Sequence, residues 1–439
     1  MRYFKRADNK PGSMFSQEQP QSGISAAIRR WSLCAVAACA LQLMAGTAPV
    51  LASDYSLIPW LAVSEEYTDN VYETHHNKRS DYITRVQPGV ALKYTAPLWD
   101  WDLSYSLDYF HYAKGNRNDD LNHNINGKGL VRIVDEVLFL EVSDVYKKVS
   151  LDVTRDISDE SLYVNQSDQN VAMVSPYLVL HPTSRLALKT GYRYINTWYK
   201  DTLAISKQDH IGFISSEYEI TPKFFLTADY IFTREIPENA SNFYRNEAYL
   251  GPRYEYAEKS FIYAKGGFID TDYDDGTHSF NPAWKAGLIH TFDTVIVDVS
   301  TGRDYTEDPL GVSTLSTYYT ALLTKNLQRG RVSLHGSYTE FSDTNLDRIT
   351  DKRYSGGFTS EYKLTRDLLG TLGLTYENYE NLRLNGTTDK YYVGCGLIYD
   401  FGNQLTVGLS YKYIDYSSKE IELDNKQVNR VILEVKKVF

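Results

Sequence analysis

The side chains best suited to chemistry gather in two polar stretches of the 439-residue chain. In the first, residues 70–81, His75 and His76 are adjacent, but no cysteine accompanies them, and two histidines are too few ligands for a zinc site. The chain also has no G-x-S-x-G nucleophile motif and no glycine-rich phosphate loop. We therefore predict that the chain is not an enzyme and holds no metal or cofactor.

Four aspartates occupy the second stretch, DTDYDDG at 270–276, which resembles the start of a calcium-binding loop. That loop requires glycine at its sixth position and glutamate at its twelfth. This chain has Asp275 and Asn281 there instead. The stretch therefore allows loose cation binding at a loop tip and does not predict a dedicated metal site.

Other charged residues belong to strictly alternating segments, of which WDLSYSLDYF (101–110) is the clearest. Its apolar side chains are Trp101, Leu103, Tyr105, Leu107 and Tyr109, and the polar ones between them are Asp102, Ser104, Ser106 and Asp108. Alternation recurs at 186–199, 224–232, 295–299 and 405–413. A period of two indicates strands with one apolar and one polar face.

The connections between these strands also alternate in length. Short turns are predicted at 96–100, 134–137, 180–184, 220–223, 327–331 and 401–404. Longer polar loops are predicted at 70–81, 115–122, 154–169, 234–242, 270–281 and 307–314. This order is typical of a closed antiparallel transmembrane β-barrel with short periplasmic turns and long extracellular loops, here of about 18–20 strands. A soluble propeller would show a blade repeat, and none is found.

Composition supports a membrane barrel. Tyr is unusually frequent, with 37 residues against 17 Phe and 6 Trp, and its amphipathic ring favours membrane interfaces. The mean hydropathy of -0.41 excludes a bundle of transmembrane helices. Membrane barrels carry a girdle of aromatic side chains at each membrane interface. If most of the Tyr side chains belong to these two girdles, only a minority of them remain to line the barrel interior.

The N-terminal sequence is typical of an export signal. Arg29 and Arg30 precede the apolar run 31–46, and small residues follow, so we predict a signal peptide at 1–52 with cleavage after Ala52. A retained anchor and a lipoprotein signal at Cys39 are the alternatives. The mature chain, 53–439, would be a single outer-membrane barrel domain in a Gram-negative bacterium.

Charge and cysteine content exclude some partners and cross-links. Removing 1–52 takes away six basic and two acidic residues and leaves 40 basic against 54 acidic, a net charge near -14. This acidic balance argues against nucleic acid as a partner. Cys395 alone remains, so no intrachain disulfide forms. Its alternation with Tyr391, Val393, Leu397 and Tyr399 predicts that it faces lipid.

In a barrel, the polar face of each strand would line the lumen. The predicted lumen-lining residues are Asp102, Asp108, Lys128, Arg132, Lys189, Arg193, Asp229 and Lys412. Both signs occur among them, so strong ion selectivity does not follow. The C-terminal segment VILEVKKVF ends in Phe439 and resembles the signal read by the barrel assembly machinery, although Lys437 stands where that signal usually has an apolar residue.

The opening strand SLIPWLAVSEEYTDNVYET (56–74) resembles that of outer-membrane barrels found with exopolysaccharide gene clusters, grouped as β-barrel porins of type 2 or as PEP-CTERM-system-associated barrels. The resemblance implies a conduit for a secreted polysaccharide that works with a separate periplasmic export protein, among outer-membrane lipid and lipopolysaccharide. The stretch Thr68-Asp69-Asn70 within it also fits a simple strand exit turn.

Two other functions stay open. A stand-alone diffusion porin for sugars or small solutes would need no partner and would conduct steadily. An adhesive barrel would depend on its long loops.

Overall fold

The structure is a computed structural model that describes residues 53–151, 166–306, 309, 314–343, 348–383, 385–420 and 425–439. Residues 53–439 form one compact unit. The predicted signal peptide lies outside the described residues. Among the residues that are described, no helix is long and apolar enough to cross a membrane.

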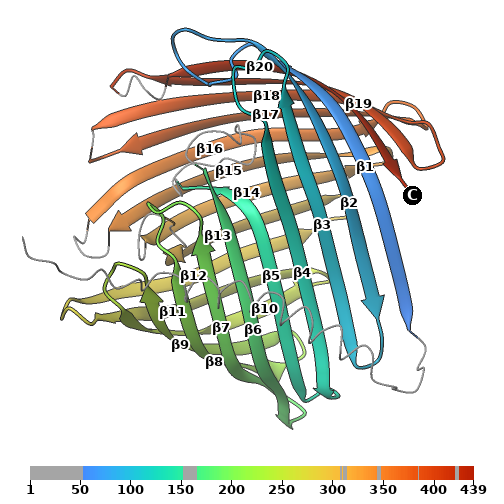
Figure 1. Ribbon diagram of the computed structural model, residues 1–439. Helices are drawn as coiled ribbons and strands as arrows, with labels where there is room; N and C mark the ends of the chain where they lie inside the picture. Colours follow the sequence, from blue (N-terminus) through green and yellow to red (C-terminus); the bar gives the residue numbers. More distant parts are fainter. Residues whose placement is uncertain are drawn as a thin grey trace, which may run out of the picture. The chain divides into compact units, whose positions relative to one another are not determined.

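Alternating sequence gives strands throughout this unit (Figure 1). The first ten are β1 (Asp54–Thr68), β2 (Asp81–Thr95), β3 (Trp99–Tyr112), β4 (Asp120–Val134), β5 (Leu138–Ser150), β6 (Gln166–Thr183), β7 (Leu186–Tyr199), β8 (Lys207–Thr221), β9 (Phe224–Pro237) and β10 (Phe243–Ala257). The next ten are β11 (Ser260–Tyr273), β12 (His278–Thr291), β13 (Val295–Thr306), β14 (Thr314–Leu327), β15 (Gly330–Asp343), β16 (Arg348–Lys363), β17 (Leu368–Asn381), β18 (Gly386–Asp400), β19 (Leu405–Ser418) and β20 (Lys426–Val438).

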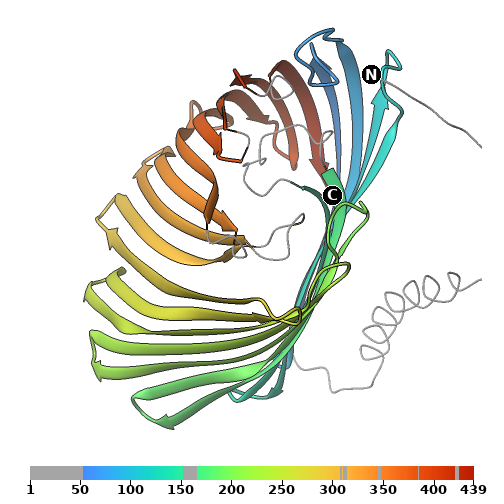
Figure 2. The same cartoon turned by 90° about the vertical axis from the view of Figure 1, so that its left-hand side faces the viewer.

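Each strand pairs antiparallel with its sequence neighbours, and β1 closes the ring by pairing with β20. The closing register runs from Trp60↔Val438 to Thr68↔Arg430. A closed ring leaves no sheet edge with unpaired backbone groups. In Figure 2 the orange and yellow strands form one side of this ring, and the blue and teal strands form the opposite side. The predicted closed antiparallel barrel is confirmed, with twenty strands in the described part of the chain.

The two ends of the barrel differ in their connections. Turns that join an even-numbered strand to the next odd-numbered one contain two to four residues, such as 184–185 and 401–404. The opposite end carries the longer loops, including 69–80. We call these the short-turn end and the long-loop end, and assign them to the periplasm and the exterior. Several predicted loops were too long. The predicted loop 270–281 is the clearest case, because β11 and β12 extend into it and only 274–277 connects them. Strands also extend into the predicted loops 115–122, 154–169 and 234–242.

Directly paired residues point to the same face of the sheet, so the register separates the two faces. The outward face carries exposed apolar side chains such as Tyr391, Leu397 and Leu433. Cys395 pairs with Leu372 and Tyr411 on that face and is exposed. The inward face carries the polar residues of each strand.

The start of the 69–80 loop fastens the seam between β1 and β20. The Asp69 amide donates to the Asn429 carbonyl at 3.2 Å, and the Asp69 carboxylate accepts from the Asn429 amide and Nδ2 at 2.8 and 2.7 Å. Asn70 is fully buried, and its Nδ2 donates to the carbonyls of Gln427 and Thr74. The Thr68-Asp69-Asn70 stretch therefore reinforces the closure of the ring at the long-loop end.

A buried carboxylate completes this seam, which we call the closure clasp (Asp69, Asn70 and Glu73 with Lys426, Gln427, Asn429 and Arg430). Glu73 accepts from Arg430 at 2.5 Å and from Lys426 at 3.3 Å. All three side chains are at most 12% exposed. The clasp joins the first loop of the barrel to its last strand.

We predict that Glu73→Ala lowers the unfolding temperature of the barrel, because it leaves two buried cations without this counter-charge, at a cost of about 3 kcal/mol or more. The heat-induced change in gel mobility of the folded barrel measures this shift. Glu361→Gln is the matched control, since its pair with Arg331 is more than half exposed on both sides. Equal shifts in the two variants would contradict a role for the clasp.

We predict that Cys395 in intact outer membranes reacts with a lipid-soluble maleimide and not with a charged thiosulfonate, because its side chain faces outward, midway between Tyr391 and Tyr399. Mass spectrometry of the labelled barrel measures the reaction, with Cys395→Ser as the blank. Rapid labelling by the charged reagent would show that the face assignment of β18 is wrong.

Candidate functional site in the barrel interior

Inward side chains are buried near the long-loop end and accessible near the short-turn end. On β3, Asp108, Phe110 and Tyr112 are at most 5% exposed, whereas Asp102, nearer the short turn, is exposed. Other strands show the same change. Their buried inward residues near the long loops include Lys207, Glu235, Ile269, Glu377, Lys390, Ile414 and Tyr416. The inward side chains are therefore covered in the long-loop half of the wall and accessible in the periplasmic half.

Some of these covered side chains are paired charges. Lys390 lies 3.0 Å from Glu377, and Lys207 lies 3.3 Å from Glu235, with every one of these side chains at most 5% exposed. Tyr379 adds a hydrogen bond to Glu377 at 2.5 Å. Buried pairs of this kind add little net stability because desolvation offsets their attraction. They keep the interior polar where the loops pack on it.

The end of the β13–β14 hairpin leaves the wall and folds inward. The register of β12 with β13 stops at Trp284↔Arg303, while β11 and β12 stay paired to Asp272↔His278. Beyond that point, Leu315 is 1% exposed and packs with three inward residues of β10–β12: Tyr249, Ile269 and Ala283. The hairpin end therefore lies against the inner wall of its neighbours.

Polar contacts hold this inward segment, which we define as residues 303–306, 309 and 314–316. The Tyr305 hydroxyl lies 3.3 Å from Thr271 Oγ1, and the Arg245 guanidinium lies 4.5 Å from the Tyr305 ring centroid. Asp304 pairs with Lys285 at 3.0 Å. These contacts reach β10, β11 and β12 in turn.

The inward segment continues to the β7–β8 loop. The buried Pro309 offers its carbonyl to the Ile205 amide at 2.8 Å. Four strands, β9–β12, separate the two loops around the wall, a width of about 24 Å at the usual strand spacing. The segment therefore crosses the inside of the barrel and narrows it at the long-loop half.

The predicted lumen-lining residues include three that take part in ion pairs. Asp108 accepts from Arg85 at 3.0 Å, and Asp229 pairs with Lys265 at 2.7 Å. Arg132 pairs closely with Asp100. These contacts balance charge along the wall.

The remaining predicted residues lie on the same inward face and have no oppositely charged side chain at ion-pair distance among the described residues. Asp102 and Lys128 are direct register partners, and Lys412 is opposite Arg430. Lys189 and Arg193 lie over aromatic rings instead. That all eight line a passage stays a prediction.

Sequence reasoning missed the inward segment and the closure clasp. Of the predicted loop 307–314, the structure describes Pro309 and Thr314, and both belong to the inward segment. The sequence did contain a signal in its apolar residues. Tyr305 and Leu315, on the two sides of this stretch, continue the apolar positions of their strands into the end of the barrel where polar residues are usual. Glu73 carried no signal, because its partners are more than 350 residues away.

The aspartates of the acidic stretch 270–276 are bound by neighbouring side chains. Arg234 donates two hydrogen bonds to the Asp274 carboxylate at 2.9 and 2.8 Å and, with Asn242, lowers the pKa of Asp274 to about 2. Asp272 accepts from His278 at 2.8 Å. Within the described residues, no group of three or more His, Cys, Asp or Glu side chains is arranged to hold a metal ion.

Tyrosines form a belt on the outward face. The rings of Tyr319, Tyr338 and Tyr354 stack across three strands at centroid distances of 6.1 and 4.7 Å. Eight residues further along their strands, Tyr362 and Tyr399 follow Tyr354 and Tyr391, about 26 Å away along a tilted strand. This spacing suits two interfacial girdles around an apolar band of about 25 Å.

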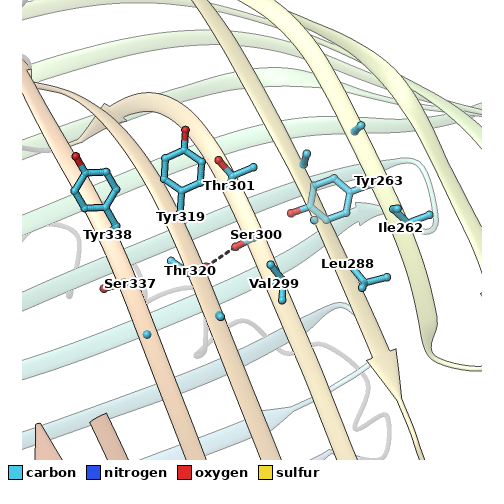
Figure 3. A pocket seen from close by; sticks show the side chains of 15 residues that line it. Ile262, Tyr263, Leu288, Val299, Ser300, Thr301, Tyr319, Thr320, Ser337 and Tyr338 are labelled. Atoms are coloured by element: carbon cyan, nitrogen blue, oxygen red, sulfur yellow. Dashed lines mark hydrogen bonds between the residues drawn. The ribbon is translucent and has the colours of Figure 1, made fainter. Parts of the chain in front are cut away.

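A hollow of about 690 Å³ lies in the wall of β11–β15 and opens outward (Figure 3). Ala264, Ala286, Ala321 and Gly336 line its floor, and Tyr319 and Tyr338 stand beside it. The outward side chains of Ile262, Leu288 and Val299 share its face. The hollow is on the lipid side of the wall and is separate from the lumen.

Comparisons with protein-family models and with curated proteins give no match. Among solved structures, the FrpB iron transporter from Neisseria meningitidis (F5-1 variant) has a TM-score of 0.52 at 9% identity, covering 87% of this chain and 82% of that one. A point mutant of the ferric enterobactin receptor PfeA from Pseudomonas aeruginosa has a TM-score of 0.51 at 9% identity, covering 88% and 80%. At such identities the likeness shows the fold: this chain has the fold of Gram-negative outer-membrane β-barrels.

We predict that Leu315→Ala raises the single-channel conductance of the barrel in planar bilayers, because it removes about 2–5 kcal/mol of packing that holds the inward segment. Leu334→Ala is the control, since Leu334 is 49% exposed on the outward face. An unchanged conductance in folded Leu315→Ala would show that the inward segment does not limit the passage.

Proposed function

We propose that this barrel is the outer-membrane conduit for secretion of an exopolysaccharide and works with a separate periplasmic export protein. The observation that carries the proposal is the inward segment, which narrows the outer half of the lumen while the periplasmic half stays lined by accessible side chains. A passage narrowed at its outer end suits release of cargo delivered from the periplasm. It suits steady diffusion less well.

Aromatic rings on the inner wall favour a sugar polymer as the cargo. Tyr263 lies over Gly287, where an added Cβ would come within 2.7 Å of the Tyr263 ring. Trp60 lies in the same way over Gly89, at 2.3 Å. Because glycine leaves room, both rings lie flat along the wall. A flat ring takes up little of the passage and offers a face on which a sugar ring can stack.

A periplasmic partner is part of the proposal. In the described residues the short-turn end consists of turns of two to four residues and holds no further domain. Delivery of a polymer to this end therefore needs another protein. The resemblance of residues 56–74 to barrels of exopolysaccharide clusters points the same way.

The solved structures of similar fold support a role in transport, but they do not support the kind of cargo. FrpB is an iron transporter and PfeA a ferric enterobactin receptor, so barrels of this fold carry cargo across the outer membrane. The kind of cargo proposed here differs from theirs.

We predict that deletion of the gene abolishes extracellular polysaccharide and leaves uptake of small sugars unchanged, because the barrel provides the exit route and no entry route. Both quantities are measured in the source organism, with the wild-type gene restored as the control. Normal polysaccharide with impaired sugar uptake would overturn the proposal and indicate a diffusion porin. Loss of surface attachment alone would indicate an adhesive barrel.

A further inference from the structure

We propose that a row of aromatic and basic side chains on the inner wall of β5–β8 binds acidic sugar units, such as uronates, of the polymer that passes through the barrel. The row consists of Phe139, Tyr177, Gly191 and Phe213, with Lys189 and Arg193 beside it. The inference rests on the proposed conduit function and assigns a chemical class to its cargo.

Register places the row at one level of the wall. Phe139 pairs with Tyr177, Tyr177 with Gly191, and Gly191 with Phe213, so the four residues are direct neighbours on four consecutive strands. Arg132 on β4 is the register partner of Phe139 and extends the row. Gly191 has no side chain and puts nothing between the rings on either side of it.

Two rings at one end form a platform. Phe139 and Tyr177 stack with centroids 5.1 Å apart and planes 15° apart. The Phe213 ring lies two strands beyond Tyr177, about 10 Å away, which is on the order of the length of a disaccharide unit. All three rings are partly exposed.

A cation lies over one ring at each end of the row. The Lys189 ammonium lies 4.0 Å from the Tyr177 centroid, and the Arg193 guanidinium lies 5.4 Å from the Phe213 centroid. Lys189 and Arg193 flank Gly191 on the same strand face. In the part of the chain that the structure describes, neither has a carboxylate at ion-pair distance.

The charge around the row is positive once the paired groups are set aside. Arg132 is paired with Asp100, and Glu217 on β8 with Arg253. Asp209 lies diagonally from Arg193 on the same face, but it is only 7% exposed. Glu141, two residues from Phe139, is a partly exposed carboxylate beside the row, and the two cations Lys189 and Arg193 outnumber it. Elsewhere the wall balances its charges, as in the Asp229–Lys265 pair.

A uronate fits this arrangement in two ways at once. Its ring can stack on the Tyr177 or Phe213 face, while its carboxylate accepts charge-assisted hydrogen bonds from Lys189 or Arg193. The cation–ring contact seen without ligand is weaker than such a bond, so a carboxylate can draw the cation off the ring. A neutral sugar gains the stacking alone.

The test is binding of oligogalacturonate and of neutral maltohexaose to the purified full-length mature barrel, measured by isothermal titration calorimetry. We expect the acidic oligomer to bind, and Lys189→Gln with Arg193→Gln to weaken it by about tenfold or more while binding of maltohexaose stays unchanged. Tyr177→Ala should weaken both oligomers, and Tyr177→Phe neither. Heat-dependent gel mobility confirms that each variant is folded.

Lys93→Gln is the matched control, because Lys93 is an exposed lysine on the inward face of β2 with no aromatic ring beneath it in the described structure. If Lys93→Gln weakens the acidic oligomer as much as the double variant, or if the wild-type barrel binds neither oligomer, the row is not a uronate site and its cation–ring contacts only pack the wall. Failure of this test with loss of polysaccharide in the deletion strain would overturn the site and leave the conduit. Binding as expected in a barrel whose deletion spares the polysaccharide would overturn the conduit.

Discussion

Backbone hydrogen bonding in lipid is the constraint on which this structure depends. Each peptide group within the bilayer must find a partner in the chain, and a sheet does this only when it closes on itself. Closure here rests on nine register pairs between β1 and β20, from Trp60↔Val438 to Thr68↔Arg430. The closure clasp adds the Asp69 and Glu73 contacts to the last strand. The strands that join first and last in the sequence are therefore fastened by side chains as well as by backbone.

A ring of this size also encloses an interior, and the side chains and loops of the chain decide how open that interior is. Twenty strands enclose more space than their own side chains fill. In the outer half, the inner wall carries buried charge pairs such as Lys390 with Glu377, and the inward segment packs on it through Leu315 at β10–β12. The periplasmic half keeps accessible side chains instead. The barrel thus has two different halves, which is the physical basis for a direction of passage.

Aromatic residues have two separate uses in this wall. On the outward face, rings such as Tyr338 and Tyr354 stack on each other at the level of a membrane interface. On the inward face, rings lie flat on glycines, as Tyr263 does on Gly287, or beneath cations, as Tyr177 does beneath Lys189. The high Tyr content therefore reflects both the membrane around the barrel and the passage within it.

Alternation by itself determined the strands, the faces and the closed barrel, because side chains in a strand point to opposite sides with a period of two. The face of Cys395 and the positions of the short turns follow from the same local rule. Only tertiary structure decided what meets across the ring. Glu73 reaches Arg430, and Pro309 reaches Ile205, through contacts between residues far apart in the sequence. No local pattern encodes such contacts, since they depend on the curvature and closure of the whole sheet. The inward fold of the segment that carries Leu315 is decided at the same level, by the inner surface that β10–β12 offer once the ring has closed.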